Sequence, residues 1–591
     1  MSDQKNLIIA VALSIAVIMG FQFFYEMPRM EAEQVRLQAL TEAQTLEETS
    51  GAETPPVSNA GLTPSVAPIA GNASGVPVLA PGTTKVGPDG ALLAAAPRVP
   101  ISSDNLRGSI SMRGGRVDDL ALVNYHETID DQSPEIVLLA PTGTEKPYHA
   151  EFGWISAPGA NLKLPTRDTL WQTTGSQLSP GSPITFGWDN GAGLLFERTY
   201  TLDDNYMFSV RQQVSNRTST AVTLYPYGLV SRTGTPEVSG FIILHEGALG
   251  VFDGELVEED YEDISEAQSQ EHNSTGGWLG FTDKYWLTAL IPDQKQRFTG
   301  TFNHSLSGQR DRYQVDYRLD AQQIPAGGSV TTLAHFFAGA KEADLLEAYN
   351  DNYKITSFDL AIDWGYLRFI TQPLFHVLKW LNGLVGNFGV AILLLTVAIK
   401  IVFFPLANKS YKSMSMMRKL QPEVVKMKER YGDDRTRMQQ EMMALYKKEK
   451  VNPMAGCLPI VVQIPVFFAL YKVLFVTIEM RHAPFFGWIK DLSAPDPMVF
   501  INLFGLIPWD PPQLLAIGIW PLMMGASMFL QQKLNPQPTD PMQAKIFMLM
   551  PIMFTFMLGS FPAGLVIYWT WNNVLSITQQ WVIMRRMGVK I

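Results

Sequence analysis

Cysteine is almost missing from this sequence: Cys457 is the only one, so no disulfide can form within the chain. It lies inside the apolar stretch GCLPIVVQIPVFF, which favours a small buried residue over a metal ligand or redox centre. The phosphate-binding pattern G-x-x-x-x-G-K-[ST] occurs nowhere in the chain. His245 and Glu246 lack the second histidine that a zinc-binding H-E-x-x-H helix requires. The sequence therefore has neither a nucleotide-binding loop nor a zinc-protease motif.

The sequence also has no excess of basic residues. The chain has 46 lysines and arginines against 56 aspartates and glutamates, a formal net charge of −10. DNA binding needs a basic face, so DNA is not an expected partner. The charge is unevenly spread: residues 30–350 are polar, acidic and rich in turn residues, whereas residues 360–591 hold most of the long apolar runs. This division predicts a multi-domain membrane protein with a large polar domain.

The first apolar run, NLIIAVALSIAVIMGFQFFY, has about the 20 residues that a bilayer-spanning helix needs. A cleaved signal peptide is the alternative, but it would have a basic start, a shorter core and small residues at its cleavage site. Here only Lys5 precedes the run, and the bulky FQFFYEMPRM ends it. We therefore expect an uncleaved anchor at residues 1–28. Residues 29–98, dense in Pro, Gly, Ala, Ser and Thr from residue 50, predict a flexible tether.

Residues 99–353 consist of short runs of β-branched and aromatic residues separated by turns, such as FERTYTLDD and MFSVRQQVSN. Partial alternation of apolar and polar residues is typical of strands with one solvated face. So many strands in one region predict a large β-sandwich. The segment AKEADLLEAYNDNY (340–353) predicts a helix at the end of this domain.

The remainder of the chain predicts a helical membrane domain. Residues 358–386 mix aromatic and basic residues, which fits an amphipathic helix lying in the membrane interface. Residues 387–591 predict a five-span core that includes a polar, basic hairpin at 408–452. The five expected spans are 387–406, 457–479, 514–531, 545–560 and 563–583. With the anchor they make six, so the predicted fold class is a six-span α-helical membrane protein with an external β-sandwich and a cytosolic helical hairpin.

The orientation follows from the basic residues near the expected spans. Lysines and arginines concentrate in the 408–452 hairpin and follow the last span at Arg585, Arg586 and Lys590. The connection at 480–513 has only Arg481 and Lys490. The positive-inside rule then places the hairpin and both termini in the cytosol and the sandwich outside.

The hairpin has helical periodicity on both sides of YGDD. Met417, Leu420, Val424, Met427 and Tyr431 recur every three or four residues, as do Met438, Met442 and Leu445, and Asp433 and Asp434 suit the start of a second helix. One interpretation is that the two helices bury these residues against each other. The other adds that methionines and basic residues bind ribosomal RNA, anionic lipid or nascent chains. The candidate recruitment residues are Met417, Arg418, Lys419, Met427, Lys428, Arg430 and Arg435.

Lys400 lies within the apolar run LLLTVAIKIVFFPL (393–406). A cation at the centre of a membrane helix costs roughly 2.5–3.5 kcal/mol. The side chain either snorkels to the cytosolic interface or faces polar groups at matched depth on neighbouring helices. The second alternative predicts a polar chamber that is open to the cytosol and closed at the apolar outer half. Its expected lining includes Thr396, Gln463, Asn572, Asn573 and Gln579.

Several long segments carry a resemblance to a known family. VGNFGVAILLLTVAIKIVFFPL, KVNPMAGCLPIVVQIPVFFALYKVL and DPMQAKIFMLMPIMFTFMLGSFPAGLVIYW closely resemble the YidC family of bacterial membrane protein insertases, kin to the Oxa and Albino proteins. The resemblance covers essentially the whole chain. The anchor and large external domain resemble the Gram-negative form, whose sandwich lies in the periplasm.

The resemblance implies an insertase of the inner membrane, without catalytic residues, metal or nucleotide cofactor. A groove open to the cytosol and to lipid would receive polar parts of the incoming chain. By motif, Lys400 matches the groove's basic residue, where the family often has arginine; Gln463 and Thr396 match groove positions, and Tyr568 and Trp569 a client-contacting aromatic pair. The implied partners are nascent membrane proteins, the ribosome and signal recognition particle pathway, the Sec translocon and the phospholipid bilayer.

Two other classes remain as alternatives. A small-solute or proton-coupled transporter would use Lys400 as its substrate site, but transporters commonly carry inverted repeats and interrupted helices in both halves. Pro459 and Pro465 interrupt only one expected span. An intramembrane protease would need a nucleophile and a base within the membrane, and none of the eight histidines falls in the five expected core spans.

Overall fold

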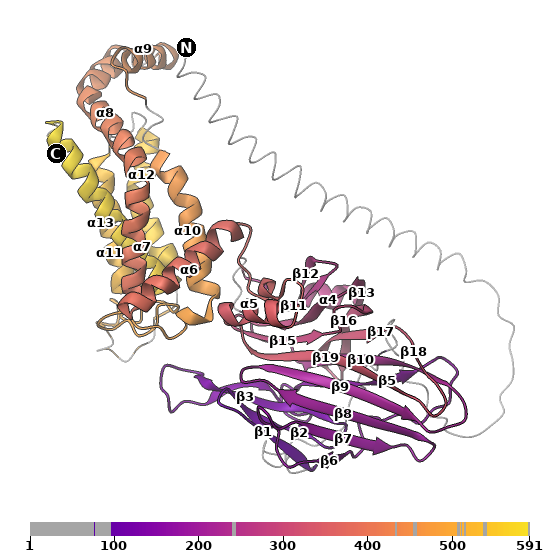
Figure 1. The fold of residues 1–591 in the computed structure, drawn as a ribbon. Helices are drawn as coiled ribbons and strands as arrows, with labels where there is room; N and C mark the ends of the chain where they lie inside the picture. The colour runs from indigo at the N-terminus through magenta and orange to yellow at the C-terminus, as the bar shows by residue number, and fades with distance from the viewer. Residues whose placement is uncertain are drawn as a thin grey trace, which may run out of the picture.

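The computed structural model describes Val76 and residues 96–588, apart from 239–243, 432–433, 453–457, 505–506, 508, 510, 513–515 and 536–540. The predicted anchor at 1–28 and nearly all of the predicted tether at 29–98 lie outside the described residues. The described chain forms a β-sandwich followed by a helical bundle (Figure 1).

One layer of the sandwich is a ten-stranded sheet in the order β1-β2-β3-β5-β10-β17-β16-β13, with β4 added on β3 and β18 on β10. Its long central pairs are antiparallel, as between β5 and β10 and between β10 and β17. Its strands are β1 (Arg98–Ser102), β2 (Leu106–Ser111), β3 (Arg116–His126), β4 (Glu135–Leu139), β5 (Tyr148–Ser156), β10 (Val222–Thr233), β13 (Ser269–Thr275), β16 (Arg297–Ser307), β17 (Arg310–Leu319) and β18 (Gln322–Ile324).

The other layer is a nine-stranded sheet in the order β12-β11-β14-β15-β19-β9-β8-β7-β6. The alternating pattern expected of half-buried strands is clear in β8, where every second side chain from Leu194 to Leu202 is buried. These strands are β6 (Gln172–Thr174), β7 (Ile184–Asp189), β8 (Leu194–Leu202), β9 (Met207–Asn216), β11 (Gly247–Phe252), β12 (Glu255–Asp260), β14 (Gly277–Thr282), β15 (Trp286–Ile291) and β19 (Ser329–Ala340). The predicted sandwich is therefore present.

The helix α5 (Ala343–Asn352) ends the sandwich domain as predicted, and the shorter α4 (Tyr261–Ala267) lies between β12 and β13. The amphipathic helix expected over 358–386 is shorter than predicted: α6 runs over Arg368–Val385 and follows a 3-10 turn at Phe358–Ala361. Gly365 interrupts the segment with a φ of 70°, a left-handed conformation that glycine adopts readily.

The polar face of α6 attaches the bundle to the sandwich domain. Lys379 forms an ion pair with Asp344 of α5 at 2.5 Å, and the Gln372 amide donates a hydrogen bond to Glu347 at 2.9 Å. Apolar side chains such as Trp380 are exposed on the same helix. This two-sided character agrees with the amphipathic helix predicted from the sequence.

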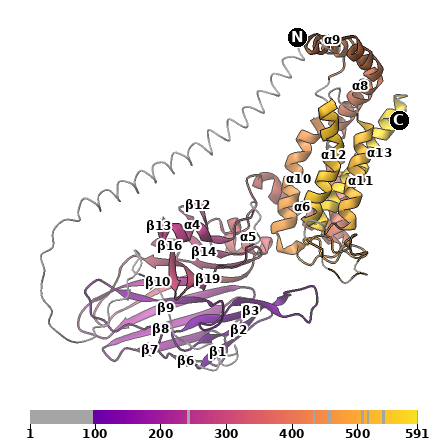
Figure 2. The same cartoon turned by 180° about the vertical axis from the view of Figure 1, so that it is seen from behind.

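The bundle consists of α7 (Phe388–Val402), α8 (Phe404–Tyr431), α9 (Arg435–Lys448), α10 (Leu458–Val476), α11 (Ile519–Leu534), α12 (Pro541–Met557) and α13 (Ala563–Arg586). The outer part of α8 and all of α9 project from the end opposite the sandwich (Figures 1 and 2). The C-terminal end of α13 lies towards that same end. One end of the bundle therefore contacts the sandwich domain, and the other end carries the projecting hairpin.

The span expected at 387–406 is not one straight helix. The chain bends by 71° between α7 and α8 at Phe403, and the helix of the hairpin begins at Phe404 rather than at 408. Pro405 gives the physical reason: it has no amide hydrogen for a continuing helix, yet it is tolerated in the first turn of a new one. Within the described ranges no single helix combines the length and apolar composition of a bilayer crossing, whereas α7 and α8 together do. The number of spans stays a prediction.

The hairpin contains the two predicted helices. The Asp434 carboxylate caps α9 by accepting a hydrogen bond from the Arg437 amide at 3.0 Å, as the sequence predicted for the helix start. Val424 is buried and Met417, Met427 and Met442 are half-buried, whereas the charged side chains between them are mostly exposed. The periodic apolar positions therefore face inward, as expected of two helices that pack together.

Candidate functional site

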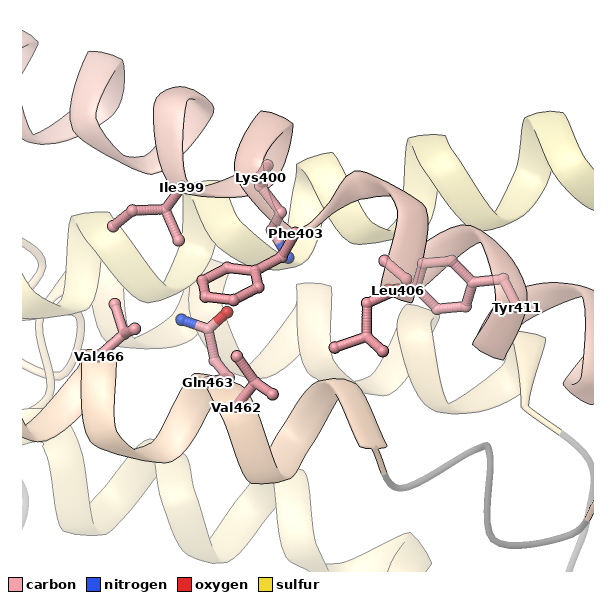
Figure 3. A pocket seen from close by; sticks show the side chains of 9 residues that line it. Ile399, Lys400, Phe403, Leu406, Tyr411, Val462, Gln463 and Val466 are labelled. Atoms are coloured by element: carbon pink, nitrogen blue, oxygen red, sulfur yellow. The ribbon is translucent and has the colours of Figure 1, made fainter. Parts of the chain in front are cut away.

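A pocket lies where α7 and α8 meet α10 (Figure 3). It contains about 420 Å³ of space not filled by protein atoms, part of it open solvent. Three of its side chains are polar, namely Lys400, Tyr411 and Gln463. The others are Ile399, Phe403, Leu406, Ala407, Val462 and Val466. The bend at Phe403 thus creates a pocket with mixed walls, less polar than the chamber that the sequence predicted.

Lys400 reaches from α7 across to α13. Its Nζ donates a hydrogen bond to Ser576 Oγ at 2.7 Å, and the same hydroxyl donates to the Asn572 carbonyl oxygen at 2.7 Å. The side chain is therefore held against a neighbouring helix. This geometry favours the predicted inward-facing lysine over one that snorkels on its own along lipid.

The ammonium of Lys400 has no carboxylate partner among the described residues. The sequences of α7, α10, α11, α12 and α13 contain neither Asp nor Glu. A cation in such surroundings has a strong preference for an anion supplied from elsewhere. The site is therefore electrostatically suited to receive a negatively charged group.

Gln463 lies on the α10 side of the same pocket, at the depth the sequence predicted (Figure 3). Its amide donates a hydrogen bond to the Tyr568 hydroxyl of α13. Tyr568 itself is buried. The lysine and the glutamine thus bind the same helix, α13, at two levels.

The helix α13 carries two polar rows. Tyr568, Asn572, Ser576 and Gln579 recur every three or four residues and share the face that Lys400 and Gln463 contact. On this row Asn572 Oδ1 and Gln579 Nε2 are buried without a hydrogen-bond partner among the described residues. Unpaired buried polar atoms are costly unless water or a ligand satisfies them.

The second row of α13 faces α11 instead. The Asn573 amide donates to Ser527 Oγ at 2.9 Å, and the Gln580 amide donates to the Leu534 carbonyl oxygen at 3.1 Å. Asn573 was expected in the chamber with Lys400, but its side chain is used to join two helices. Adjacent side chains of an α-helix point about 100° apart, so Asn573 and Asn572 face different neighbouring helices.

Comparison with known proteins identifies the family. Residues 98–377 match the family model described as YidC periplasmic domain, and residues 380–590 match that described as 60Kd inner membrane protein. Two curated relatives, each named membrane protein insertase YidC, are 51% identical: one from Methylobacterium radiotolerans and one from Bradyrhizobium diazoefficiens. Both alignments cover 100% of this chain, and 96% and 97% of the relative. The chain belongs to the YidC family.

Among solved structures, the chain is similar to an active YidC insertase whose first transmembrane domain is resolved. That likeness covers 83% of this chain and 95% of the other, with 17% identity and a TM-score of 0.34. The first family model covers the sandwich and ends within α6, and the second covers the rest of α6 and the helices that follow it.

Of the eight residues predicted for the YidC groove, Lys400 and Gln463 line the pocket; the others, Thr396, Tyr568, Trp569, Asn572, Asn573 and Gln579, do not. Thr396 is buried, and its hydroxyl donates to the Ile392 carbonyl oxygen of its own helix at 2.7 Å. Trp569 packs edge-on against Phe467 of α10 at 4.5 Å between ring centroids and also contacts Phe554 of α12. Tyr568 and Trp569 are adjacent in sequence but lie on different faces of α13.

The basic residues predicted for recruitment fall into two groups. Arg418 Nη1 donates to the Leu534 carbonyl oxygen at 3.2 Å, and Lys419 Nζ donates to the Met587 carbonyl oxygen at 2.6 Å. These cations satisfy carbonyl groups at the C-terminal ends of α11 and α13, where the helix dipole favours positive charge. Lys428 and Arg430 are exposed further along α8, and their part in recruitment stays a prediction. The placement of Arg435 is described for its backbone only.

Tyr411 was not predicted for this site, and Ser576 was predicted only as one of several polar residues in the last expected span, not as a chosen site residue. Ser576 stands at helical spacing between Asn572 and Gln579, which was a usable signal for the row that meets the lysine. Tyr411 enters the pocket from α8 because that helix starts at Phe404. The predicted hairpin start at 408 assigns Tyr411 to the cytosolic hairpin, so the sequence prediction does not place it in the pocket.

Proposed function

We propose that this chain is a membrane protein insertase, and that the pocket beside Lys400 receives polar parts of the client. The single observation that carries the proposal is the Lys400 ammonium, held at the pocket by Ser576 without a carboxylate partner among the described residues. The names of the curated relatives support the activity. The pocket residues and their roles are our inference.

The first step is entry of a short acidic segment of the client into the pocket. Taking a carboxylate out of water costs several kcal/mol, and a nearby cation offsets part of that cost. In the pocket Lys400 supplies the cation and Gln463 a neutral hydrogen-bonding group. Asn572 and Gln579 do not line the pocket, but each has an unpaired buried amide atom on the face of α13 that Lys400 contacts. A carboxylate that enters from the cytosol therefore meets charge and polar partners before it meets lipid.

The second step is release of the apolar client helix. Side chains of α10 beside the pocket, including Val461, Ile464 and Phe468, are exposed and apolar. Such a surface suits contact with lipid or with a client helix. The client then partitions into the bilayer, and the membrane potential contributes about 2.3 kcal/mol per charge per 100 mV for an acidic segment moving outward. No covalent step is required.

The orientation we propose has the hairpin and both termini in the cytosol, the sandwich in the periplasm and six spans in the inner membrane. The basic hairpin at the bundle end opposite the sandwich supports it. Exposed Lys428 and Arg430 then offer contacts to a ribosome or a signal recognition particle. Cooperation with the Sec translocon belongs to the same proposal.

The test compares Lys400→Met with Lys400→Arg in cells depleted of the native protein. A client with a short acidic external tail should insert at least about tenfold more slowly with methionine, equivalent to about 1.4 kcal/mol. Arginine keeps the charge and should retain insertion. Lys409→Met, an exposed position on α8, is the matched control. Normal insertion of the acidic client by Lys400→Met would contradict the proposal.

A transporter with Lys400 as its substrate site remains the alternative prediction, but neither curated relative reported above is named a transporter. Uptake of candidate solutes by proteoliposomes that hold the purified chain would separate the two functions.

A further inference from the structure

A short apolar turn lies in the connection between α10 and α11, which the sequence predicts outside the membrane. Residues 499–504 (VFINLF), which we call the apolar turn, contain no charged side chain. Four of its large apolar side chains are 39–55% exposed: Phe500, Ile501, Leu503 and Phe504. Single exposed apolar side chains are normal on a protein surface, but four within five residues form a patch that marks a contact.

The backbone of the apolar turn is paired within the protein. The Leu503 amide donates to the Phe500 carbonyl oxygen at 3.1 Å, and the Phe504 amide donates to the Val499 carbonyl oxygen at 3.0 Å. At the base of the turn, the Phe500 amide donates to the Ile517 carbonyl oxygen at 3.1 Å. Backbone groups in lipid need such pairing, because no water is present to replace it. These amides therefore suit surroundings without water.

The described charged residue nearest to the apolar turn in sequence faces inward. Asp496 is 4% exposed. Its carboxylate accepts hydrogen bonds from the Trp488 indole at 2.9 Å, the Met498 amide at 3.0 Å and the Trp520 amide at 2.8 Å. The Trp520 amide belongs to the first turn of α11, where the helix dipole favours a negative charge. The charge is thus satisfied inside the protein, whereas the side chains that the turn exposes are apolar.

The length of α11 places the base of the apolar turn within the membrane. The helix has 16 residues, or about 24 Å at 1.5 Å per residue, against about 30 Å for the hydrocarbon core of a bilayer. Its last residue, Leu534, accepts a hydrogen bond from Arg418 of α8, which puts this end at the cytosolic interface in the orientation proposed above. The helix therefore starts about 6 Å short of the outer boundary, and any tilt increases the shortfall. The hydrogen bond from Phe500 to Ile517 holds the turn beside that start.

We propose that the apolar turn enters the outer leaflet of the membrane beside the start of α11, with its four exposed side chains in contact with lipid chains. Lipid fits better than a protein partner, because the first turns of α11 expose apolar side chains as well, at Leu522 and Met523. The connection between α10 and α11 is then only partly external. The proposal uses the orientation given above and is independent of the role of Lys400.

The test measures the depth of a nitroxide spin label on a single cysteine in the full chain. The chain is reconstituted in phospholipid vesicles in a Cys457→Ser background, and Leu503→Cys places the label in the apolar turn. Leu306→Cys, 63% exposed on β16 of the sandwich, is the control in water. Ile552→Cys, 57% exposed on α12, is the control in lipid. Electron spin resonance compares collisions with oxygen, which concentrates in lipid, and with a water-soluble nickel chelate.

We expect the ratio of oxygen to chelate collisions at position 503 to be at least about fivefold higher than at position 306 and similar to that at position 552. Ile501→Cys should give the same result, so the test does not depend on the folding of one variant. A ratio equal to that at position 306 would overturn the proposal, because the bilayer would then thin to the length of α11 and leave the turn in water. Low collision rates with both reagents would overturn it too and assign the turn to a protein partner. Either failure would leave the pocket at Lys400 unaffected.

Discussion

Lys400 and Ser576 join α7 to α13 by a hydrogen bond of 2.7 Å from the ammonium to the hydroxyl. Because Ser576 passes its own hydrogen to the Asn572 carbonyl oxygen, its oxygen is oriented to accept from the lysine. An ammonium has three donors, so two remain for water or a client carboxylate. The serine therefore positions the charge and leaves part of it available.

Ser576→Ala should weaken insertion of an acidic-tailed client by roughly three- to tenfold, about the effect of losing one hydrogen bond of ordinary strength. The loss should be smaller than with Lys400→Met, because the charge remains. Ser576→Thr keeps the hydroxyl and should restore most of the rate. The measurement is the insertion rate of the client in each variant. An equal loss with Thr and Ala would show that the hydroxyl is not what matters.

Asn573 and Ser527 predict a stability effect separate from insertion. Their interhelical hydrogen bond of 2.9 Å joins α13 to α11. Side-chain hydrogen bonds between membrane helices contribute about 0.6 kcal/mol on average and up to about 1.7 kcal/mol. Asn573→Ala should lower the free energy of unfolding in detergent within that range and leave insertion near normal.

Ser527→Ala provides the double-mutant test of this contact. If the two residues act through one bond, the double variant should be little less stable than either single one. Fully additive losses would mean that the side chains act independently.

Lys341 predicts a pH dependence for the sandwich domain. Burial lowers the pKa of this lysine to about 8, while its Nζ donates to Thr282 Oγ1 at 2.7 Å. Below pH 8 the amine is charged in the folded and unfolded chains, and burial of that charge destabilises the fold. Between pH 8 and 10.5 the unfolded chain binds more protons, so this contribution to stability rises with pH.

Lys341→Met should therefore raise the unfolding free energy at pH 7 by up to about 3 kcal/mol. The gain over the parent should shrink as the pH approaches 10. Urea denaturation followed by tryptophan fluorescence measures both, with the exposed Lys146→Met as control. A gain that stays constant across this pH range would assign the effect to packing rather than to charge.

Lys472 and Asp363 predict a coupling between bundle and sandwich. Lys472 on α10 pairs with Asp363 at 2.6 Å, and the Asp363 carboxylate also accepts from the His245 amide at 3.4 Å. Lys472→Met or Asp363→Asn should each cost about 1–2 kcal/mol, since the pair is only partly exposed. Hydrogen exchange of residues 358–367 should accelerate in either single variant and no further in the double one. Additive acceleration would contradict a direct pair.

The sequence predicted that two pocket residues lie together because depth in a helical membrane protein follows from residue spacing. Counting about 1.5 Å per residue from the cytosolic ends placed Lys400 and Gln463 at the same level, and both line the pocket. The rotation of each helix was not accessible in this way. Thr396 and Asn573 stand at suitable depths, yet one bonds to its own helix and the other to α11.

The types of secondary structure were predictable from the sequence, whereas the strand order and the bends between helices were less so. The alternating strands of the sandwich and the capped hairpin follow from local pattern, whereas the pairing order of nineteen strands does not. Pro405 was a visible sign of the bend between α7 and α8, but the apolar run through Phe403 and Phe404 masked it. Arg418 and Lys419 bind helix ends that are distant in sequence, which no local pattern reveals.

The most direct test of the account is the access of water to the pocket. Gln463→Cys in a Cys457→Ser background places one thiol in the pocket, and Phe468→Cys places one on the exposed apolar side of the same helix. A membrane-impermeant maleimide added from the cytosolic side should label position 463 at least tenfold faster than position 468, and position 463 should not react from the periplasmic side. Labelling of position 463 only from the periplasm, or not at all, would contradict a pocket that opens to the cytosol.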